Sequence, residues 1–262
     1  MAVSTQIASS LDKSLALLFA FADPDDDQQV FTVSGLAEQQ GMDKAQVSRI
    51  LATFAKYGLV ERLEQRRGYQ LGWSIVHLAS RALTAQTMSS LYPVLTRLAD
   101  EWEETVHFSV RDGAHAVALA SFEPDRRLYV RVPVGRRDAL VGSAVGYVLL
   151  SRSDDGEVRS VFDETSRRTR IEAGSWGEVR GLVEHVRAAG YSMVVNERDD
   201  QITTVAVPIH DVGNYRDRVY AAVAVSAPDE RIGARRDELV ERLLGVASEA
   251  NAFLQGREAG QE

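Results

Sequence analysis

The chain of 262 residues has no cysteine and no apolar run long enough to cross a membrane. The lack of cysteine excludes disulfides, thiolate zinc sites and cysteine nucleophiles. Every apolar run is shorter than the ~18 residues that a membrane helix needs. The opening residues, MAVSTQIASS, also lack the basic and then apolar pattern of an export signal. We therefore expect a cytoplasmic protein that does not bind membranes.

The motifs of common enzymes are missing as well. The sequence contains no P-loop, no G-x-G-x-x-G segment and no G-x-S-x-G elbow. None of the five histidines lies four residues from another, which removes the helical metal pair. His107 and His115 can face each other across a hairpin, but two nitrogens without carboxylates placed beside them make a poor metal site. We predict no catalytic residue, no metal ion and no cofactor.

Acidic charge dominates the chain as a whole but not every part of it. The net charge is -8 and the isoelectric point is about 5.3, which argues against a protein that coats nucleic acid non-specifically. Residues 41–70 instead carry a net charge of +3. This distribution is compatible with one local DNA-binding face.

Residues 43–58, DKAQVSRILATFAKYG, predict an amphipathic helix in that basic segment. Asp43 suits the N-cap, Gln46 follows three residues later as in a capping box, and Gly58 can end the helix. One face of this helix gathers the apolar residues Val47, Ile50, Leu51 and Phe54. The opposite face carries small and polar side chains without any acid, and it is the candidate surface for a partner.

The surrounding segments complete the pattern of a winged helix-turn-helix. Residues 9–22 form a helical segment with a stripe of Leu11, Leu15, Leu18 and Phe19, and a charged turn follows at 23–27. A short helix at 33–40 comes next, with Thr32 as its cap and Gly41 as its end. After the third helix, LVERL and YQLGW flank the polar loop EQRRG and predict a hairpin. In such a fold the third helix enters the major groove of DNA.

We predict DNA contacts from the third helix and from the hairpin loop. Ala45 allows close approach to the groove floor, while base edges can meet Gln46, Ser48, Arg49 and Thr53. The phosphates can meet the basic residues Lys44, Lys56, Arg66 and Arg67. A helix of this kind can also be an ordinary solvated surface helix, but the complete order of elements favours DNA binding.

From about residue 89 the pattern changes to α+β. The expected strands are at 104–112, 115–123, 126–134, 203–210 and 218–228. The expected helices are at 91–104, after the cap residue Ser143, and at 154–162, 175–190 and 237–255. Strands framed by helices in this order suit a sensor domain that binds a ligand.

Several of these motifs resemble the IclR family of transcriptional regulators, over about residues 9–255. Two motifs in the hairpin carry the resemblance. Gly58-Leu59-Val60 and Arg62 are similar to "GLV.R", and Tyr69, Leu71 and Gly72 are similar to "Y.LG". The resemblance implies a winged helix-turn-helix domain at 1–73, a linker helix at 74–88 and a GAF-like α/β effector-binding domain at 89–262. It also implies that subunits pair through the linker and the N-terminal domain, as a dimer or a tetramer.

The same resemblance implies a set of effector-binding residues in the second domain. VGRRDALVGSAVGYVLLS, AAGYSMVVNERDDQITTVAVPIHD and AAVAVSAP are similar to the segments that line the family's effector pocket. Carried over by position, the set is Leu140, Ser143, Ala144, Val195, Glu197, Thr204, Ala224 and Ser226. A helix start at Ser143 suits a carboxylate. Departures such as Val141, Tyr147 and Ala224 make the set less polar than usual, so we expect a small organic acid with an apolar or aromatic body.

Two classes of function remain open from the sequence. The first is a regulator that binds a double-stranded DNA operator, a small-molecule effector and further copies of itself. The second is a metabolite-binding protein or an enzyme whose N-terminal helices serve assembly only. The acid-free face of 43–58 and the arginines of the hairpin loop favour the first, because an assembly helix would more often present leucines there. Repression and activation both stay open, as does the identity of the effector.

Overall fold

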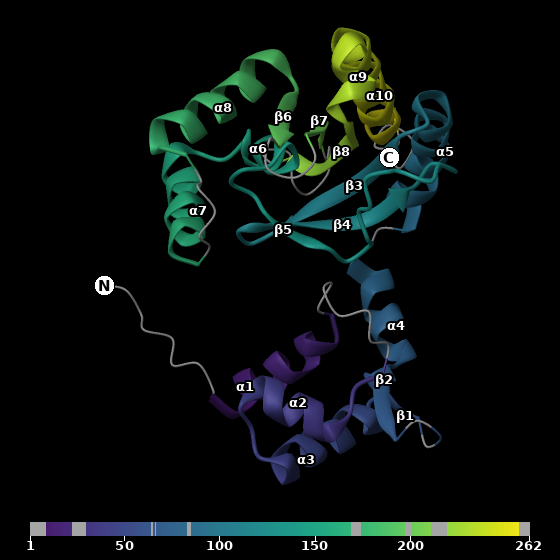
Figure 1. Ribbon diagram of the computed structural model, residues 1–262, viewed down its shortest axis with the longest axis vertical. Helices are drawn as coiled ribbons and strands as arrows, with labels where there is room; N and C mark the ends of the chain where they lie inside the picture. The colour runs from purple at the N-terminus through teal and green to yellow at the C-terminus, as the bar shows by residue number, and fades with distance from the viewer. Residues whose placement is uncertain are drawn as a thin grey trace. The chain divides into compact units, whose positions relative to one another are not determined.

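The computed structural model describes residues 9–22, 30–63, 65, 67–82, 85–168, 174–196, 201–210 and 219–256. They fall into two compact units, Met1–Gln86 and Thr87–Glu262. The first consists of helices with a small hairpin, and the second has a sheet with helices on both faces (Figure 1). The α+β class expected from the sequence is therefore confirmed.

The first unit has the order of elements that the sequence predicts. Helix α1 (Ser9–Phe19) continues into a 3-10 turn, η1 (Ala20–Ala22), and the helices α2 (Val33–Gln40) and α3 (Lys44–Lys56) follow. The antiparallel strands β1 (Val60–Leu63) and β2 (Gly68–Leu71) form the hairpin, and helix α4 (Trp73–Ala82) comes after them. This is a winged helix-turn-helix.

Capping residues set the turn between α2 and α3. Thr32 Oγ1 accepts a hydrogen bond from the amide of Gly35 at 3.1 Å, so α2 begins where the sequence predicts. Gly41 has a φ of 61°, a left-handed conformation that glycine adopts without steric cost and that ends α2. Asp43 Oδ1 then accepts from the amides of Ala45 and Gln46 at 2.9 and 3.2 Å and starts α3. The turn fixes how α3 is held against α2.

The interior of this unit uses another face of α1 than the stripe in the sequence. Leu17 is fully buried and Phe21 is 8% exposed, whereas Leu11, Leu15 and Phe19 are 59%, 44% and 62% exposed. Periodicity reveals an apolar stripe, but it does not reveal what the stripe packs against. The exposed stripe is an apolar surface of the single chain.

The hairpin also departs from its predicted ends. Trp73, which the sequence pattern assigns to the second strand, is the first residue of α4 and is 81% exposed. Where the strand ends, only glycine fits at position 72, because a Cβ there would lie 2.2 Å from the Gly58 carbonyl oxygen. On its other side β2 gains a bridge, since Phe31 and Tyr69 exchange two backbone hydrogen bonds of 2.8 Å.

A six-stranded antiparallel sheet, in the order β5-β4-β3-β8-β7-β6, organises the described part of the second unit. Its strands are β3 (Thr105–Asp112), β4 (His115–Phe122), β5 (Arg137–Ala139), β6 (Ser192–Asn196), β7 (Ile202–His210) and β8 (Val219–Pro228). The helices are α5 (Ala85–Trp102), α6 (Ala144–Leu150), α7 (Asp155–Arg168), α8 (Trp176–Ala189), α9 (Asp229–Ile232) and α10 (Arg236–Gly256), with a 3-10 turn η2 (Gly233–Arg235) before α10.

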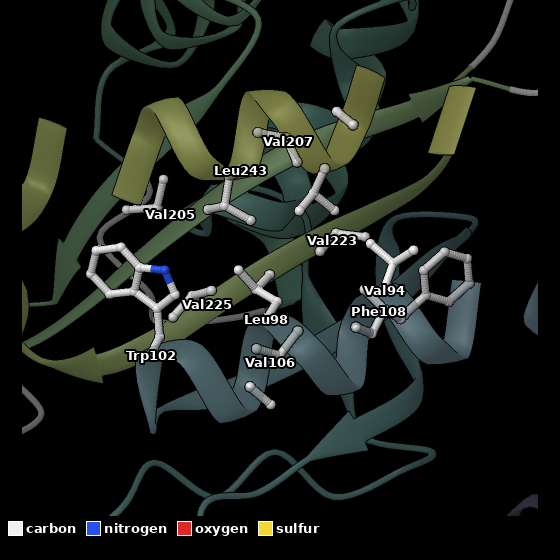
Figure 2. Close-up of a cluster of buried hydrophobic side chains, with 14 of the residues drawn as sticks. Val94, Leu98, Trp102, Val106, Phe108, Val205, Val207, Val223, Val225 and Leu243 are labelled. Carbon is white, nitrogen blue, oxygen red and sulfur yellow. The ribbon is translucent and has the colours of Figure 1, made fainter. Parts of the chain in front are cut away.

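The two faces of this sheet have different side chains. On one face, valines of β3, β7 and β8 pack against α5 and α10. Figure 2 shows this core, with Leu98 and Trp102 of α5 and Leu243 of α10 against Val205, Val207, Val223 and Val225. On the other face the central strands present Ala206, Ala222 and Ala224, and α6 packs there together with α7 and α8. Successive side chains of a strand point to opposite faces, so one alternating sequence serves both layers.

One predicted strand is wrong. Residues 126–134, expected to be a strand, form neither helix nor strand, and the strand beside β4 is Arg137–Ala139. The edge of β4 is occupied instead by Gly135 and Arg136: the amide of Gly135 donates to the Ala118 carbonyl at 2.7 Å, and the Ala118 amide donates to the Arg136 carbonyl at 3.1 Å. The preceding segment is held by Thr105, whose hydroxyl donates to the Val130 carbonyl at 2.6 Å.

Gly146 of α6 has no room for a side chain. A Cβ there would lie 1.8 Å from the Leu140 carbonyl oxygen. We expect Gly146→Ala to lower the free energy of unfolding by about 3 kcal/mol, since the backbone must move to relieve the clash. Gly181→Ala in α8, where a Cβ meets nothing within 4 Å, is the matched control and should raise stability by up to ~1 kcal/mol. Urea unfolding of both variants tests this, and equal stabilities would contradict it.

Candidate functional site

Helix α3 presents its predicted outer face to solvent. Lys44, Ala45, Ser48, Arg49, Thr53 and Lys56 are exposed and Gln46 is half-buried. Below them Val47 and Leu51 are fully buried and Phe54 nearly so, while Ile50 is half-buried at the edge of the same core. A side chain on the outer face therefore stands on a helix that the core holds in place.

The polar groups of this face are largely free to meet a partner. The Arg49 guanidinium makes no hydrogen bond or ion pair within the described residues. Thr53 donates its hydroxyl hydrogen to the Arg49 carbonyl at 3.0 Å, which leaves its oxygen as an acceptor. Lys56 Nζ lies 5.7 Å from the centroid of the exposed Tyr57 ring, a cation–π contact that keeps the ammonium at the surface. Tyr57 is a candidate contact that the sequence analysis did not name.

The wing, which is the hairpin of β1 and β2 with its loop, supplies fewer described residues to the candidate DNA-binding surface. Arg67 is exposed, with a φ of 48°, and Arg62 on β1 is exposed opposite Tyr69. Glu61 accepts a hydrogen bond from Gln70 Nε2 at 3.1 Å across the hairpin. Arg66, the other predicted phosphate contact, lies outside the described residues.

In the second unit, part of the predicted effector set gathers on the α6 face of the sheet. Thr204 pairs in register with Ser226, and the next pair on that face is Ala206 with Ala224. Leu140 and Ala144 are buried in the same apolar cluster as Ala224. Val195 does not join them: it pairs with Thr203, one residue out of phase, so Val194 lies on the α6 face instead. Glu197 lies outside the described residues.

Ser143 is a helix cap in the structure. Its hydroxyl accepts from the amide of Gly146 at 3.0 Å, and it lies 3.1 Å from the Ala139 carbonyl, to which it donates. The sequence predicts this cap correctly. Helix α6 has only seven residues, however, and one of its first amides is already bonded. Its start is therefore a weaker attraction for a carboxylate than the sequence analysis expects.

A chain of polar side chains, which the sequence analysis missed, crosses three strands on the α6 face. Ser109 Oγ lies 3.3 Å from His107 Nδ1, His107 Nε2 lies 3.2 Å from Ser226 Oγ, and Ser226 Oγ lies 2.9 Å from Thr204 Oγ1. Ser109, His107 and Ser226 are 3%, 6% and 3% exposed, whereas Thr204 is only half-buried. The signal was present in TVHFS, where polar residues alternate with apolar ones and so mark a polar face.

The imidazole of His107 is neutral at physiological pH. Burial, as the larger cause, and the positive charge of Arg136 together lower its pKa from 6.5 to about 4. Opposite His107 in the β3–β4 register lies Ser121, whose buried hydroxyl has no partner within the described part of the chain. Neutral hydrogen-bonding groups thus dominate this region.

Two family models match the sequence. The IclR helix-turn-helix domain matches residues 10–64, and the bacterial transcriptional regulator IclR C-terminal domain matches residues 81–252. The chain belongs to the IclR family. It is a transcriptional regulator, and its relatives in the family are regulators rather than enzymes.

Individual IclR proteins resemble the chain along most of their length. The HTH-type transcriptional regulator Rv1719 of Mycobacterium tuberculosis is 28% identical over 85% of each chain. The Pca regulon regulatory protein of Pseudomonas putida is 26% identical over 94% of this chain and 82% of its own. An IclR homolog of Microbacterium hydrocarbonoxydans, solved with 4-hydroxybenzoate, superposes with a TM-score of 0.77 at 18% identity, over 94% of this chain and 99% of its own. The last likeness concerns the fold alone.

A cavity of about 510 Å³ lies away from the residues that the IclR resemblance implicates. It sits where α6 ends, lined by residues that include Ser151, Arg152, Arg187, Pro208 and His210. Pro208 pairs with Ala222, four residues along β8 from the Ser226 that pairs with Thr204, so the cavity is separate from the Thr204–Ser226 pair. Within the described residues no group of three or more metal-ligating side chains exists, and no helix is long and apolar enough to span a membrane.

His107 makes the stability of this unit sensitive to acid. Its pKa is about 4 when folded and 6.5 when unfolded, so between these values the unfolded chain binds the proton and the folded chain does not. The free energy of unfolding therefore decreases as the pH falls from about 6.5 to 4, by about 3 kcal/mol in total. Unfolding of wild type and His107→Gln by urea from pH 7 to pH 4 should show a steeper loss for wild type. Parallel curves would contradict this.

Proposed function

We propose that this IclR-family regulator binds a DNA operator through α3 and the wing, as a dimer or tetramer, and that a small organic acid with a partly apolar body controls it. The observation that carries the proposal is the outer face of α3, which is exposed, free of acids and built on a buried apolar face. The first unit, with the hairpin loop, would serve DNA binding, and the second unit would bind the effector. We propose 74–88 as the linker between them.

The chemistry of α3 supports base reading over assembly. Its exposed face has alanines that let the helix approach the groove floor, and the Arg49 guanidinium, which has no partner among the described residues, can form two hydrogen bonds with a guanine. An assembly surface would instead present large apolar side chains. The proposed contacts are Lys44, Ala45, Gln46, Ser48, Arg49, Thr53, Lys56, Arg66 and Arg67.

Exposed apolar residues elsewhere in the first unit support the pairing of subunits. Leu11, Leu15 and Phe19 follow one another at helical spacing on α1, and Trp73 and Val76 at the start of α4 are 81% and 58% exposed. A single chain gains nothing from such surfaces, whereas a second copy can bury them. Two recognition helices can then read two half-sites about one turn of DNA apart.

The effector proposal rests on the α6 face of the sheet. The proposed contacts are Leu140, Ser143, Ala144, Thr204, Ala224 and Ser226, together with Val195 and Glu197 from the family pattern. Small and apolar side chains surround few polar ones there, which suits an apolar body with one polar group. The complex of the Microbacterium homolog with 4-hydroxybenzoate is a relevant precedent for such a ligand. The effector can act only as far as it binds two conformations of the regulator differently.

A pull-down of genomic fragments with the purified protein at rising salt tests operator binding. We expect one fragment to survive salt that removes the others, because base contacts outlast phosphate contacts as salt increases. Arg49→Ala should then weaken binding to that fragment by roughly tenfold or more per half-site, from the loss of a bidentate contact.

Arg97→Ala is the matched control for Arg49→Ala, since it removes an exposed arginine of the second unit that forms a surface ion pair with Glu249. Such pairs contribute little to stability, so its DNA binding should equal that of wild type. Equal weakening by both substitutions would contradict the assignment of α3.

Subunit pairing through α1 is tested by adding charge to its exposed stripe. The double substitution Leu15→Glu and Phe19→Glu should shift the protein to monomers in sedimentation experiments, because it would place carboxylates in an apolar interface. Both residues are exposed in the single chain, so the fold should persist. Lys13→Glu on the same helix is the control for charge alone. An unchanged oligomer in the double variant would refute the proposed interface.

A further inference from the structure

The polar chain on the α6 face has a direction. Each hydroxyl donates one hydrogen and can accept another, and a neutral imidazole donates from one nitrogen and accepts at the other. Ser109, His107, Ser226 and Thr204 are linked end to end by contacts of 3.3, 3.2 and 2.9 Å. Either these hydrogens all point toward Thr204, or at least one of the buried hydroxyls of Ser109 and Ser226 has a hydrogen without an acceptor among the four residues.

One direction satisfies every buried hydrogen. Ser109 donates to His107 Nδ1, the Nε2–H of His107 donates to Ser226 Oγ, and Ser226 donates to Thr204 Oγ1. The hydrogen that remains belongs to the hydroxyl of Thr204, the least buried member of the chain. That hydrogen can meet water or a ligand.

The reverse direction leaves a buried hydrogen without an acceptor. Nδ1–H would then donate to Ser109 Oγ, and the hydroxyl hydrogen of Ser109 would need another partner. Ser109 is 3% exposed, and the only hydrogen-bond contact of its hydroxyl within the described residues is with His107. A buried, unpaired hydroxyl is costly enough to favour the first direction by roughly tenfold or more.

We propose that His107 is a positioning residue of the effector region, and that its Nε2–H tautomer makes the Thr204 hydroxyl a hydrogen-bond donor. A free donor at this point favours ligands with an acceptor-only group, such as the carboxylate of an organic acid, over ligands with an ammonium group. This inference rests on the proposed effector region and narrows the chemistry of its ligand. The hydroxyl of Ser121, opposite His107 in the sheet and without a partner among the described residues, offers a further donor on the same face.

The tautomer is measured directly by nitrogen-15 NMR of protein labelled in its histidine rings, at pH 7 and without DNA. The signals of His107 are assigned by their loss in His107→Gln. We expect a neutral ring protonated at Nε2. Protonation at Nδ1 would reverse the chain, make Thr204 an acceptor and overturn the proposal. A failure of operator binding would contradict the proposed function but leave this result unchanged, so the two are distinguishable.

Calorimetry with benzoate and benzylamine tests the selectivity. Wild type should bind benzoate at least tenfold more tightly than benzylamine, because charge-assisted bonds to a carboxylate are strong. Thr204→Val, which removes the hydroxyl but keeps the shape, should weaken benzoate binding about tenfold, while Thr204→Ser should retain it.

His107→Gln keeps a donor toward Ser226 and should bind benzoate nearly as wild type does, whereas His107→Leu should lose affinity as Thr204→Val does. This rescue separates positioning from mere packing, because glutamine and leucine both lack the planar ring and only glutamine keeps a donor. Tighter binding of benzylamine than of benzoate, or benzoate affinity that is the same in Thr204→Val as in wild type, would overturn the proposal.

Discussion

Strand β8 has to face two different layers, and its alternating sequence is the constraint on which the second unit depends. Val223 and Val225 complete the core against α5 and α10, while Ala222 and Ala224 face α6. Alanine leaves little height above the sheet, so α6 can pack closely on it. The segment before α6 adds a second constraint, because a Cβ on Gly146 would meet the Leu140 carbonyl oxygen. Because the period of a strand is two, the same alternation carries Ser226 to the α6 face, where β3 contributes His107.

A polar chain buried beside this packed helix is stable only if its hydrogen bonds are complete. Its two inner members, His107 and Ser226, each have two partners. The imidazole of His107 is neutral because burial lowers its pKa. A charged ring would instead need a buried counter-ion. Arg136, whose positive charge also lowers the pKa of His107, is held by Asp138 through two contacts of 3.0 Å. In the proposed effector region, selection of an anion would therefore depend on the direction of the hydrogen bonds in the polar chain more than on the net charge of the surrounding side chains.

Local signals made the first unit largely predictable. Thr32, Gly41 and Asp43 act on their immediate neighbours, so their caps and turns follow from the sequence. The stripe of α1 could not be assigned in the same way, because its partner is not part of the single chain's core. In the second unit the strand register decides which side chains face α6, and one residue of register places Val194 there instead of Val195. The edge of β4 is likewise occupied by hydrogen bonds with Gly135 and Arg136, and not by the predicted strand at 126–134. The polar face of TVHFS was visible in advance, but its link to Ser226 is a tertiary contact.

The acidity of the chain bears on how its DNA-binding surface must work. Few cations are available on α3 and the wing, and a net charge of -8 gives no general attraction to phosphates. Non-specific binding is therefore weak, and base contacts have to supply much of the preference for an operator. One half-site read by a short helix gives limited discrimination, since each good bidentate contact contributes only about 1–3 kcal/mol. Two copies joined through apolar surfaces such as that of α1 would double this contribution. Under the proposed function, the exposed stripe of α1 and the acid-free face of α3 therefore serve the same purpose, which is recognition of an operator by paired subunits.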